Sequence, residues 1–274
     1  MPRARPAPAA AVPGEDELLG LALDAARAGA AQLLERFGGA REGVRAKSTP
    51  TDLVSDADLA AEAAIRRLLA ERRPQDALLA EEGGASGAGA LRWVIDPLDG
   101  TINFLFGLPQ FAVSIACEDA AGALAAVVLD PVRNEAFAAT RSGPATLNGT
   151  AITASDCAQL DRALVATGFA YDAALRARQA RLLVRVLPRV RDIRRAGAAA
   201  LDLAWCACGR VDAYYERGLK PWDWAAGALI AARAGLAVRR LEPGEDGPEG
   251  LLAAPPALVD QLAQLVGGPE GLPA

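Results

Sequence analysis

The chain of 274 residues is predicted to have a mixed α/β fold of the α+β type. Three observations predict this class. Segments with helical periodicity come first, a series of strand-like segments separated by turns follows, and strands then alternate with helices toward the C-terminus. A hydrophobic content of 52% with 23% charged residues is typical of a globular protein, and the length lets one large domain or two closely packed lobes bury a full core.

The first part of the chain is predicted to be a tail followed by two helices. Residues 1–14 are rich in Pro and Ala, lack the apolar stretch of a signal peptide and are expected to be disordered. Glu15 to Phe37 has the pattern of an amphipathic helix. A second helix is predicted from Ser55 to about Arg72, because Ser55 and Asp58 have the spacing of a capping box.

The middle of the chain is predicted to form an antiparallel meander. A short buried strand, Ala77 to Ala80, delivers an acidic pair that begins at Glu81 into a glycine-rich loop over residues 83–89. The next strand, Leu91 to Ile95, ends at Asp96. Three further strand-like segments are separated by turn residues: Phe111 to Glu118, Ala123 to Asp130 and Glu135 to Thr140.

A turn at residues 147–149 is predicted to separate two lobes. An N-terminal α+β lobe would span residues 15–146 and a C-terminal α/β lobe residues 147–268, with a second tail over 269–274. The C-terminal lobe is predicted to contain strands at Leu164 to Thr167, Asp192 to Arg194 and Ala213 to Glu216, helices at Ala173 to Val186, Ala198 to Cys208, Asp223 to about Ala234 and Pro256 to Leu265, and a polar loop at Gly244 to Gly250.

Composition excludes several classes of protein. A net charge of −5 argues against a general nucleic-acid binder, and no apolar run approaches the roughly 20 residues that cross a bilayer. The chain has no histidine, which excludes Ser-His-Asp and Cys-His nucleophiles and imidazole-bound metals. Its four cysteines lack the spacing of a disulfide framework, which indicates reduced thiols in a cytoplasmic protein. A hydrolase built from this chain would use carboxylates, hydroxyls, lysine and metal.

Four carboxylates share one kind of placement. Each follows an apolar segment and precedes a turn or helix: Glu81, Asp96, Asp99 and Asp223. Because sheet ends can converge in space, the four are expected to form an acidic pocket, which would raise its own pKa values unless cations neutralise it. Hard cations prefer oxygen ligands, so the set predicts a site for two or three Mg²⁺ ions. Taken singly, Asp99 and Asp223 are more simply helix N-caps, and Glu81 a solvated group.

A phosphate site is predicted beside the same residues. The strand exit at residues 96–101, Asp-Pro-Leu-Asp-Gly-Thr, is typical of a tight turn into a helix. Backbone N–H groups at a helix start can hold a phosphate oxygen. Gly100 and Thr101 are therefore the candidate phosphate-binding residues.

Several separated motifs carry a family resemblance. Residues 96–104, Asp-Pro-Leu-Asp-Gly-Thr-Ile-Asn-Phe, resemble the first signature of the inositol monophosphatase family of metal-dependent phosphatases, and residues 222–227, Trp-Asp-Trp-Ala-Ala-Gly, resemble its second. Residues 47–55, Asp58 and residues 80–82 match the family's upstream elements in the expected order. The resemblance covers about residues 16–265 and implies a layered αβαβα sandwich of the fructose-1,6-bisphosphatase-like type, inhibition by Li⁺ and a homodimer.

The resemblance implies a metal-binding role for the matching residues. Glu81, Asp96 and the backbone carbonyl of Leu98 would hold the first Mg²⁺. Asp96, Asp99 and Asp223 would hold the second, and a third, looser ion would lie near Glu81. Two such ions about 4 Å apart would clamp the attacking and leaving oxygens of a phosphate ester in line.

The resemblance also implies how water and substrate are held. The Thr101 hydroxyl, oriented by Asp58, would position the attacking water, and Lys47 would border the water shell of the third ion near Glu81. The residues implied to contact the substrate are Leu98, Asp99, Gly100, Thr101, Gly197, Ala198, Ala199, Glu216 and Asp223. The chain departs from the family pattern at Ala198, where Ser or Thr is common, and at Ala80, where glycine is frequent. Neither departure removes a metal ligand, so the departures are expected to alter substrate preference rather than to abolish activity.

These features predict a cytoplasmic, Mg²⁺-dependent phosphomonoesterase that hydrolyses inositol monophosphate with metal-activated water. The expected partner is a small phosphate ester, with neither nucleic acid nor membrane. Phosphatases of the same fold that act on histidinol phosphate, fructose 1,6-bisphosphate or 3′-phosphoadenosine nucleotides are the alternatives. Asn103-Phe104 favours the inositol-type group, and no additional basic loop for a second phosphate is apparent. A regulatory partner of RNA or transcription machinery and a degenerate ligand-binding relative are further alternatives.

Overall fold

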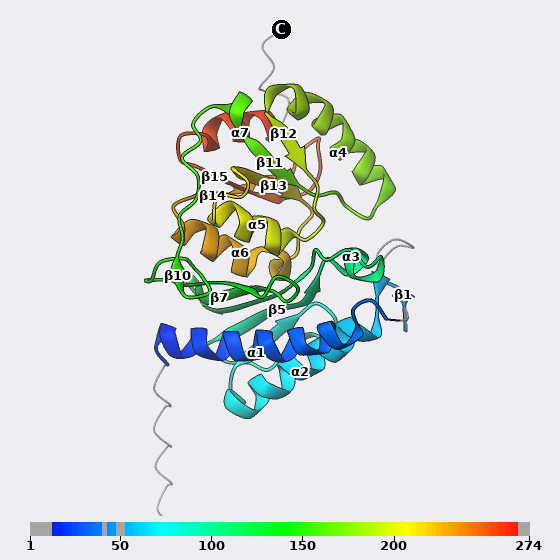
Figure 1. Ribbon diagram of the computed structural model, residues 1–274, viewed down its shortest axis with the longest axis vertical. Coiled ribbons are helices and arrows are strands. Elements are labelled where there is room, and N and C mark those ends of the chain that lie inside the picture. Colours follow the sequence, from blue (N-terminus) through cyan, green and yellow to red (C-terminus); the bar gives the residue numbers. More distant parts are fainter. Residues whose placement is uncertain (1–12, 40–42, 48–52, 268–274) are drawn as a thin grey trace, which may run out of the picture.

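The computed structural model describes residues 13–39, 43–47 and 53–267. Its helices and sheets stack in five layers, helix–sheet–helix–sheet–helix (Figure 1). The predicted αβαβα arrangement is therefore confirmed. The two predicted tails lie outside the described residues, apart from Pro13 and Gly14.

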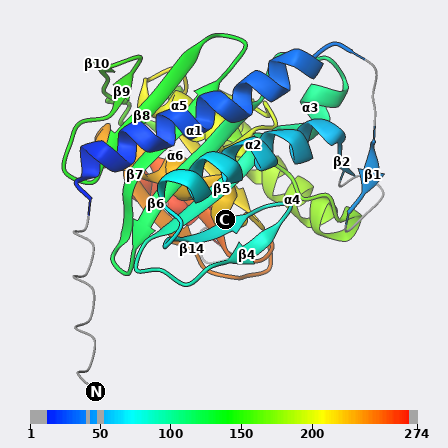
Figure 2. The same cartoon turned by 90° about the horizontal axis from the view of Figure 1, so that it is seen from below.

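The first layer contains the helices α1 (Glu15–Arg36) and α2 (Asp56–Arg72), which lie side by side across one face of the first sheet (Figure 2). Acidic residues fill the first turn of α1, where negative charge complements the helix dipole. The predicted capping box of α2 is confirmed. The Ser55 hydroxyl accepts a hydrogen bond from the N–H of Ala57, and the Asp58 carboxylate accepts one from the N–H of Ser55.

The first sheet has eight strands in the order β10-β9-β8-β7-β6-β5-β3-β4. They are β3 (Ala77–Ala80), β4 (Gly84–Ser86), β5 (Arg92–Asp99), β6 (Ala112–Asp119), β7 (Gly122–Asp130), β8 (Glu135–Thr140), β9 (Thr146–Leu147) and β10 (Thr150–Ala151). The predicted meander is confirmed, because β6, β7 and β8 pair antiparallel in sequence order. Strand β3 runs parallel to β5.

Two expectations about this sheet are corrected. Residues 83–89, predicted as a loop, contain β4, whose backbone pairs antiparallel with β3. The turn at residues 147–149, predicted as a lobe boundary, joins β9 to β10, and β9 pairs with β8, so the first sheet continues to Ala151. Such short strands form because their backbone pairs with a neighbouring strand, and their few residues show no clear hydrophobic periodicity. A separate pair is formed by β1 (Arg45–Ala46) and β2 (Leu53–Val54).

The second sheet has five strands in the order β12-β11-β13-β15-β14. Three of its strands lie where strands were predicted and pair parallel: β11 (Leu164–Thr167), β12 (Asp192–Arg194) and β13 (Ala213–Arg217). The antiparallel strands β14 (Ala237–Leu241) and β15 (Gly250–Ala254) were not predicted. All five residues of β15 are buried, and an apolar run without alternation does not distinguish a strand from a buried helix.

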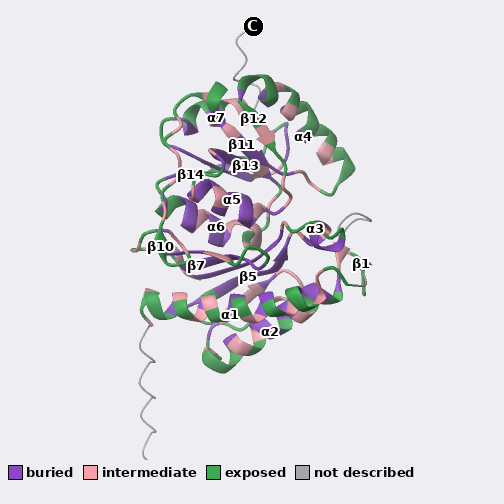
Figure 3. Cartoon of the chain, viewed as in Figure 1, coloured by how far each residue is buried: buried purple, intermediate pink, exposed green. Residues whose placement is uncertain are grey.

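The remaining helices cover the two faces of this second sheet. Helices α5 (Ala199–Ala207) and α6 (Pro221–Arg233) lie between the two sheets, and α4 (Ala173–Val186) and α7 (Val259–Val266) form the outer layer (Figure 1). Single turns of 3₁₀ helix occur at Leu160–Arg162 and Leu187–Arg189. Buried residues lie where the layers face one another, and the outer helix faces are exposed (Figure 3). Within the described part of the chain, no helix combines the length and apolarity needed to cross a membrane.

Candidate active site

The two aspartates of the strand exit face one cavity because β5 carries a bulge between them. Asp96 lies opposite Ser114 on β6, and Asp99 lies opposite Ala112, so β5 contains one extra residue. Residues three apart on a regular strand point to opposite faces, and one inserted residue brings them to the same side. The bulge therefore aims both carboxylates into the same site, where they are 2% and 8% exposed.

Gly100 makes the sharp turn from β5 into the short helix α3 (Thr101–Leu105). Its φ of +96° lies in the left-handed region, where a side chain is strained. A Cβ atom at this position would also stand 2.9 Å from the carbonyl oxygen of Gln110. Glycine is thus required for both conformation and space.

Hydrogen bonds hold the Thr101 hydroxyl in place. The hydroxyl lies 3.0 Å from Oδ1 of Asp58 and 3.1 Å from the carbonyl oxygen of Leu98. The other carboxylate oxygen of Asp58 accepts from the N–H and the hydroxyl of Ser55, at 2.8 and 2.6 Å. Burial raises the pKa of Asp58, and the bonds from Ser55 and Thr101 oppose the rise. A hydroxyl that donates its proton in this way keeps its lone pairs available to accept from water.

Asp99 caps a helix, although not the helix that follows it. Its carboxylate accepts from the N–H groups of Ala199, Ala200 and Leu201 at the start of α5, at 3.0, 2.8 and 3.3 Å. The N-cap residue of α5 is Ala198, whose side chain has no acceptor. Asp99 therefore supplies from β5 the negative charge and the acceptors that this helix start needs. Burial raises the pKa of Asp99 to about 7, and the three N–H groups oppose the rise.

Asp223 lies in the first turn of α6, which begins two residues before the predicted helix start at Asp223. The helix begins at Pro221, whose fixed φ suits the first helical position. The Asp223 carboxylate accepts from the N–H of Lys220 at 2.7 Å. Burial raises the pKa of Asp223 well above its usual value, and the charges of Glu81 and Asp99 add to the rise against the opposing bond from Lys220.

Lys47 bridges two glutamates that follow β3. Its Nζ donates to Oε1 of Glu81 at 2.6 Å and to Oε1 of Glu82 at 2.5 Å. Burial lowers the pKa of Lys47, but the two carboxylates raise it by more, so the ammonium stays protonated. Burial raises the pKa of Glu82 to about 7, against the hydrogen bond from Lys47. Glu82 is a site residue to which the sequence pattern assigned no role of its own.

Glu216 closes the opposite side of the site at the end of β13. The hydroxyl of Tyr214 donates to its Oε2 at 2.8 Å. The carboxylate lies directly over Gly168, where any side chain would occupy the same space. Burial raises the pKa of Glu216, and Tyr214 and Arg195 oppose the rise.

These elements enclose a cavity of about 530 Å³. The predicted site residues on its wall are Lys47, Glu81, Asp96, Leu98, Asp99, Gly100, Thr101, Gly197, Ala198, Ala199, Glu216 and Asp223. Asp58 is the one predicted site residue that lies behind the wall, under Thr101. The fold therefore brings together residues from both sheets and from both helices of the central layer. Of the predicted upstream element, residues 48–52 lie outside the described residues.

The chemistry of this wall fits hard cations, although no ligand set is preformed. Burial raises the pKa of Asp96 well above its usual value, and the neighbouring charges of Glu81, Asp99 and Asp223 raise it further. Cations relieve such repulsion. Among the described residues, no three side chains of the types that bind metals are arranged to hold one ion, because these carboxylates face N–H and ammonium donors of the protein. The predicted Mg²⁺ ligands therefore stay a prediction.

Asn103 connects the two sides of the cavity, a role that was not predicted from the sequence. Its amide nitrogen lies 2.7 Å from the carbonyl oxygen of Gln110, 2.8 Å from that of Ala196 and 3.3 Å from that of Gly197. The amide thus ties α3 to the loop before α5. Gly197 is 94 residues away in the chain, a separation that no local pattern reports.

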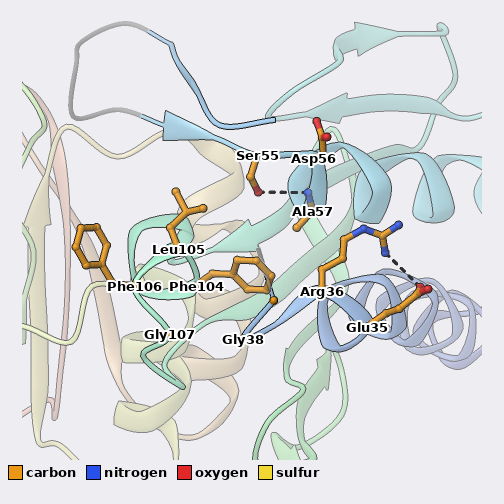
Figure 4. A pocket seen from close by; sticks show the side chains of 11 residues that line it. Glu35, Arg36, Gly38, Ser55, Asp56, Ala57, Phe104, Leu105, Phe106 and Gly107 are labelled. Atoms are coloured by element: carbon orange, nitrogen blue, oxygen red, sulfur yellow. Dashed lines mark hydrogen bonds and ion pairs between the residues drawn. The ribbon is translucent and has the colours of Figure 1, made fainter. Parts of the chain in front are cut away.

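A second cavity, of about 380 Å³, is shown in Figure 4. The end of α1, the start of α2 and α3 form it, with Phe104 and Leu105 on its wall. Ser55 lines it as well, so it borders the residues that orient Asp58. Arg36 on its rim already contacts Glu35, at 3.3 Å. The buried carboxylates that converge in the first cavity do not line this one, so the candidate chemistry belongs to the first.

An αβαβα sandwich with buried carboxylates, a left-handed glycine and an oriented hydroxyl at one strand end is the arrangement expected of a metal-dependent phosphatase. The sequence profile described as the inositol monophosphatase family matches residues 15–267. The chain belongs to the inositol monophosphatase family.

Individual relatives agree with this assignment. The chain is 44% identical over 236 residues to the inositol-1-monophosphatase of Mycobacterium leprae. The aligned region covers 80% of this chain and 79% of that protein. It is 48% identical over 195 residues to the Nus factor SuhB of Pseudomonas aeruginosa, covering 67% of this chain and 70% of that protein. Among solved structures, the extragenic suppressor protein suhB of Bartonella henselae superposes with a TM-score of 0.85 at 32% identity, covering 93% of this chain and 100% of that chain.

Proposed function

We propose that the protein is a Mg²⁺-dependent phosphomonoesterase that hydrolyses inositol monophosphate to inositol and phosphate. The observation that carries the proposal is the convergence of Glu81, Asp96, Asp99 and Asp223 with Thr101 on the wall of one cavity. The similarity to an inositol-1-monophosphatase supports the choice of substrate.

Two to three Mg²⁺ ions would be held by the four carboxylates and the Leu98 carbonyl. Bound Mg²⁺ would neutralise the carboxylates and the phosphate and make water a better nucleophile. The carboxylates are already buried at one place, so binding needs only changes of side-chain partner: Glu81 would give up its bond to Lys47, and Asp99 its bonds to α5. The positive end of α5 would then be available to a ligand hydroxyl or phosphate oxygen.

Thr101 and Asp58 would orient the attacking water. With its proton directed to Asp58, the Thr101 oxygen accepts a hydrogen bond from water and fixes the direction of the water lone pair. The buried Asp58 is in turn fixed by two bonds from Ser55, so the hydroxyl cannot turn away at low cost. This pair performs in a chain without histidine the orienting task that an imidazole performs in other hydrolases.

The polyol would lie between Glu216 and the start of α5. One oxygen of the Glu216 carboxylate accepts from Tyr214, which leaves the other to accept from a substrate hydroxyl. Ala198 provides no hydroxyl there, so recognition of this part of the substrate depends on Glu216 and on backbone groups.

The decisive experiment is phosphate release measured with Mg²⁺ titration. The substrate panel comprises myo-inositol 1-phosphate, histidinol phosphate, fructose 1,6-bisphosphate and 3′-phosphoadenosine 5′-phosphate. We expect the highest kcat/KM on the inositol ester, no turnover in EDTA and inhibition by Li⁺. Turnover that persists without a divalent cation would overturn the proposed chemistry, and a higher kcat/KM on another ester would overturn the substrate.

Asp96→Asn tests the carboxylate cluster directly. We expect kcat to fall by about a thousandfold or more with the fold retained, because the amide removes the negative charge of the carboxylate that would bind both Mg²⁺ ions. Asp119→Asn is the matched control, since Asp119 lies at the end of β6, pairs with Arg141 and is not on the cavity wall. Equal activity of the two variants would contradict the metal assignment.

A second candidate function, regulation of transcription, is favoured by the similarity to a protein named a Nus factor. Affinity capture with wild-type and Asp96→Asn protein separates the two functions. If the protein acts as a regulator, the inactive variant should still capture its partner, and the wild-type protein should show negligible turnover on every ester.

We further propose that the protein is a homodimer in the cytoplasm. Light scattering would measure the mass of the dimer. The four free cysteines suit a reducing compartment.

A further inference from the structure

Glu62 is a buried carboxylate on α2 that the proposed chemistry does not use. It is 4% exposed and does not line the cavity. It follows Asp58 by four residues, so the two carboxylates lie one turn apart on the same face of α2. A buried charge is costly unless other groups compensate it, so the partners of Glu62 indicate its role.

The partners of Glu62 include the turn that joins β3 to β4. Its Oε2 accepts a hydrogen bond from the N–H of Glu82 at 2.9 Å, and its Oε1 accepts one from the N–H of Gly83, also at 2.9 Å. Oε1 accepts a further bond from Nε of Arg66 at 2.7 Å. Arg66 in turn donates to the carbonyl oxygen of Gly84 at 2.9 Å. Two residues of α2 thus hold the backbone of residues 82–84.

The same turn begins with Glu81, one of the proposed Mg²⁺ ligands. The N–H of Glu81 donates to the carbonyl oxygen of Ile95 on β5, at 3.1 Å. The backbone is therefore fixed by β5 at this residue and by Glu62 directly after it. The Glu81 side chain is bound to Lys47, which it would exchange for the cation. The backbone hydrogen bonds do not involve this carboxylate, so they can persist while the side chain changes its partner.

The Glu62 carboxylate lies directly against the bare backbone of the turn. A Cβ atom at Gly83 would stand 2.5 Å from Oε1 of Glu62 and 2.6 Å from Nη2 of Arg66. The φ of Gly83 lies outside the left-handed region. An alanine at this position would therefore be opposed by contact with the two side chains rather than by backbone strain.

We propose that Glu62 is a positioning residue for the cation site: from α2 it holds the turn after β3 at the place from which the Glu81 carboxylate reaches Mg²⁺. Asp58, one turn earlier, orients Thr101, so one face of α2 would place both the water-orienting hydroxyl and a metal ligand. The inference rests on the proposed function. Groups that hold metal ligands in place typically account for about 10–100-fold in metal affinity. Loss of the Glu62 contacts should therefore weaken the binding of Mg²⁺ itself.

Calorimetric titration of the protein with Mg²⁺, without substrate, tests the proposal. Glu62→Gln keeps the shape of the side chain, but its amide nitrogen is a donor and cannot accept from the second backbone N–H. We expect the Kd for Mg²⁺ to rise about tenfold. The KM for myo-inositol 1-phosphate at saturating Mg²⁺ should change by less than about twofold, because Glu62 does not line the cavity. An unchanged Kd would overturn the proposal.

Two control variants separate positioning from stability. Asp76→Asn alters another buried carboxylate, directly before β3, which accepts from Arg73 and Trp93 rather than from the turn. In urea denaturation it should lower the free energy of unfolding, as Glu62→Gln does, but its Kd for Mg²⁺ should match wild type. Glu71→Gln makes the same substitution at an exposed position of α2 and should change neither quantity. An equal rise of the Kd in Asp76→Asn and Glu62→Gln would overturn the proposal.

Gly83→Ala tests the same contact without altering the charge of Glu62. The added methyl group separates the carboxylate from the turn, so the Kd for Mg²⁺ should rise as it does in Glu62→Gln. If Glu62→Gln does not fold, this variant decides the question. A wild-type Kd in Gly83→Ala would then overturn the positioning role.

Failure of the proposed phosphatase function is recognised separately. If the wild-type protein binds Mg²⁺ but hydrolyses no ester of the panel, the phosphatase proposal fails, and the titrations still test Glu62. Mg²⁺-dependent turnover with an unchanged Kd in Glu62→Gln would overturn the positioning role alone. If the wild-type protein bound no Mg²⁺, that role would be overturned whatever the turnover.

Discussion

At the scale of single residues, Thr101 links the fold most directly to the proposed chemistry. Its hydroxyl proton is shared between Asp58 and the Leu98 carbonyl, so only the oxygen lone pairs face the cavity. A residue without this hydroxyl keeps the helix start but loses the group that directs water.

Thr101→Val is expected to lower kcat by about a hundredfold, within the usual range for lost proton-transfer and orienting groups, with KM little changed. Thr101→Ser should stay within about tenfold of wild type, because it retains the hydroxyl. Steady-state kinetics on myo-inositol 1-phosphate would measure both. If valine and serine gave the same kcat, the hydroxyl would have no role in orienting water.

Asn103 acts at the same scale, as a positioning residue between two loops. Asn103→Ala leaves the carbonyl oxygens of Gln110 and Ala196 without their donor, and a buried group left in this way costs about 1–3 kcal/mol. We expect a lower free energy of unfolding by that amount and a raised KM for the inositol ester, because the loop at Gly197 loses its tie to α3. Asn148→Ala, which removes a loop amide from the exposed β9–β10 turn, is the comparison; an equal KM for the two variants would contradict the positioning role.

At the scale of elements, the path from β5 into α3 depends on one left-handed residue. The bulge in β5, Gly100 and the start of α3 follow one another within a few residues, and together they direct Asp96, Asp99 and Thr101 into the cavity. An element of this kind tolerates little change in backbone angle.

Gly100→Ala should therefore lower the free energy of unfolding by about 2–4 kcal/mol, since left-handed strain is added to a close approach to the Gln110 carbonyl. Gly149→Ala is the matched control, because Gly149 has a φ of +80° in the β9–β10 turn but open space around it. Its cost should be the strain alone, about 1–2 kcal/mol. Urea denaturation would measure both values, and equal costs would show that the contact with Gln110 does not matter.

At the scale of the whole molecule, the five layers concentrate negative charge at one place between the sheets. Burial raises the pKa of Asp99 to about 7 from an ordinary 3.8 and raises those of Asp96 and Asp223 well above it. In the pH range from about 4 to 7 the folded protein thus binds protons that the unfolded chain has released. The free energy of unfolding falls as pH rises through that range.

Without divalent cations, we expect the Tm to fall between pH 5 and pH 8, and Mg²⁺ to restore it mainly at pH 8, where the ion does not compete with bound protons. At a hundredfold excess over its Kd, Mg²⁺ would add about 2.7 kcal/mol. Differential scanning calorimetry at both pH values, with Mg²⁺ and with EDTA, measures the effect. If Mg²⁺ raised the Tm equally at pH 5 and pH 8, or raised it as much in Asp96→Asn as in wild type, the stabilisation would not come from the carboxylate cluster.

Most helices and strands were predictable because their apolar residues recur with the period of the element. This holds for α1, α2, the β6–β8 meander and the parallel strands β11, β12 and β13. Strands β14 and β15 were missed since one is a mixed, partly exposed edge and the other a short, fully buried run. These two segments form strands because of the strands they pair with, and not because of their own hydrophobic periodicity.

The sequence by itself determined the order of the main elements, the motifs of the family and the carboxylates, glycine and hydroxyl of the candidate site. Each of these follows from local periodicity or from residues within a few positions of one another. Only the tertiary structure decided that Asp99 caps α5, 100 residues away, and that Asn103 holds the loop at Gly197. Such contacts depend on how the layers pack, and packing between distant segments leaves no trace in a local pattern.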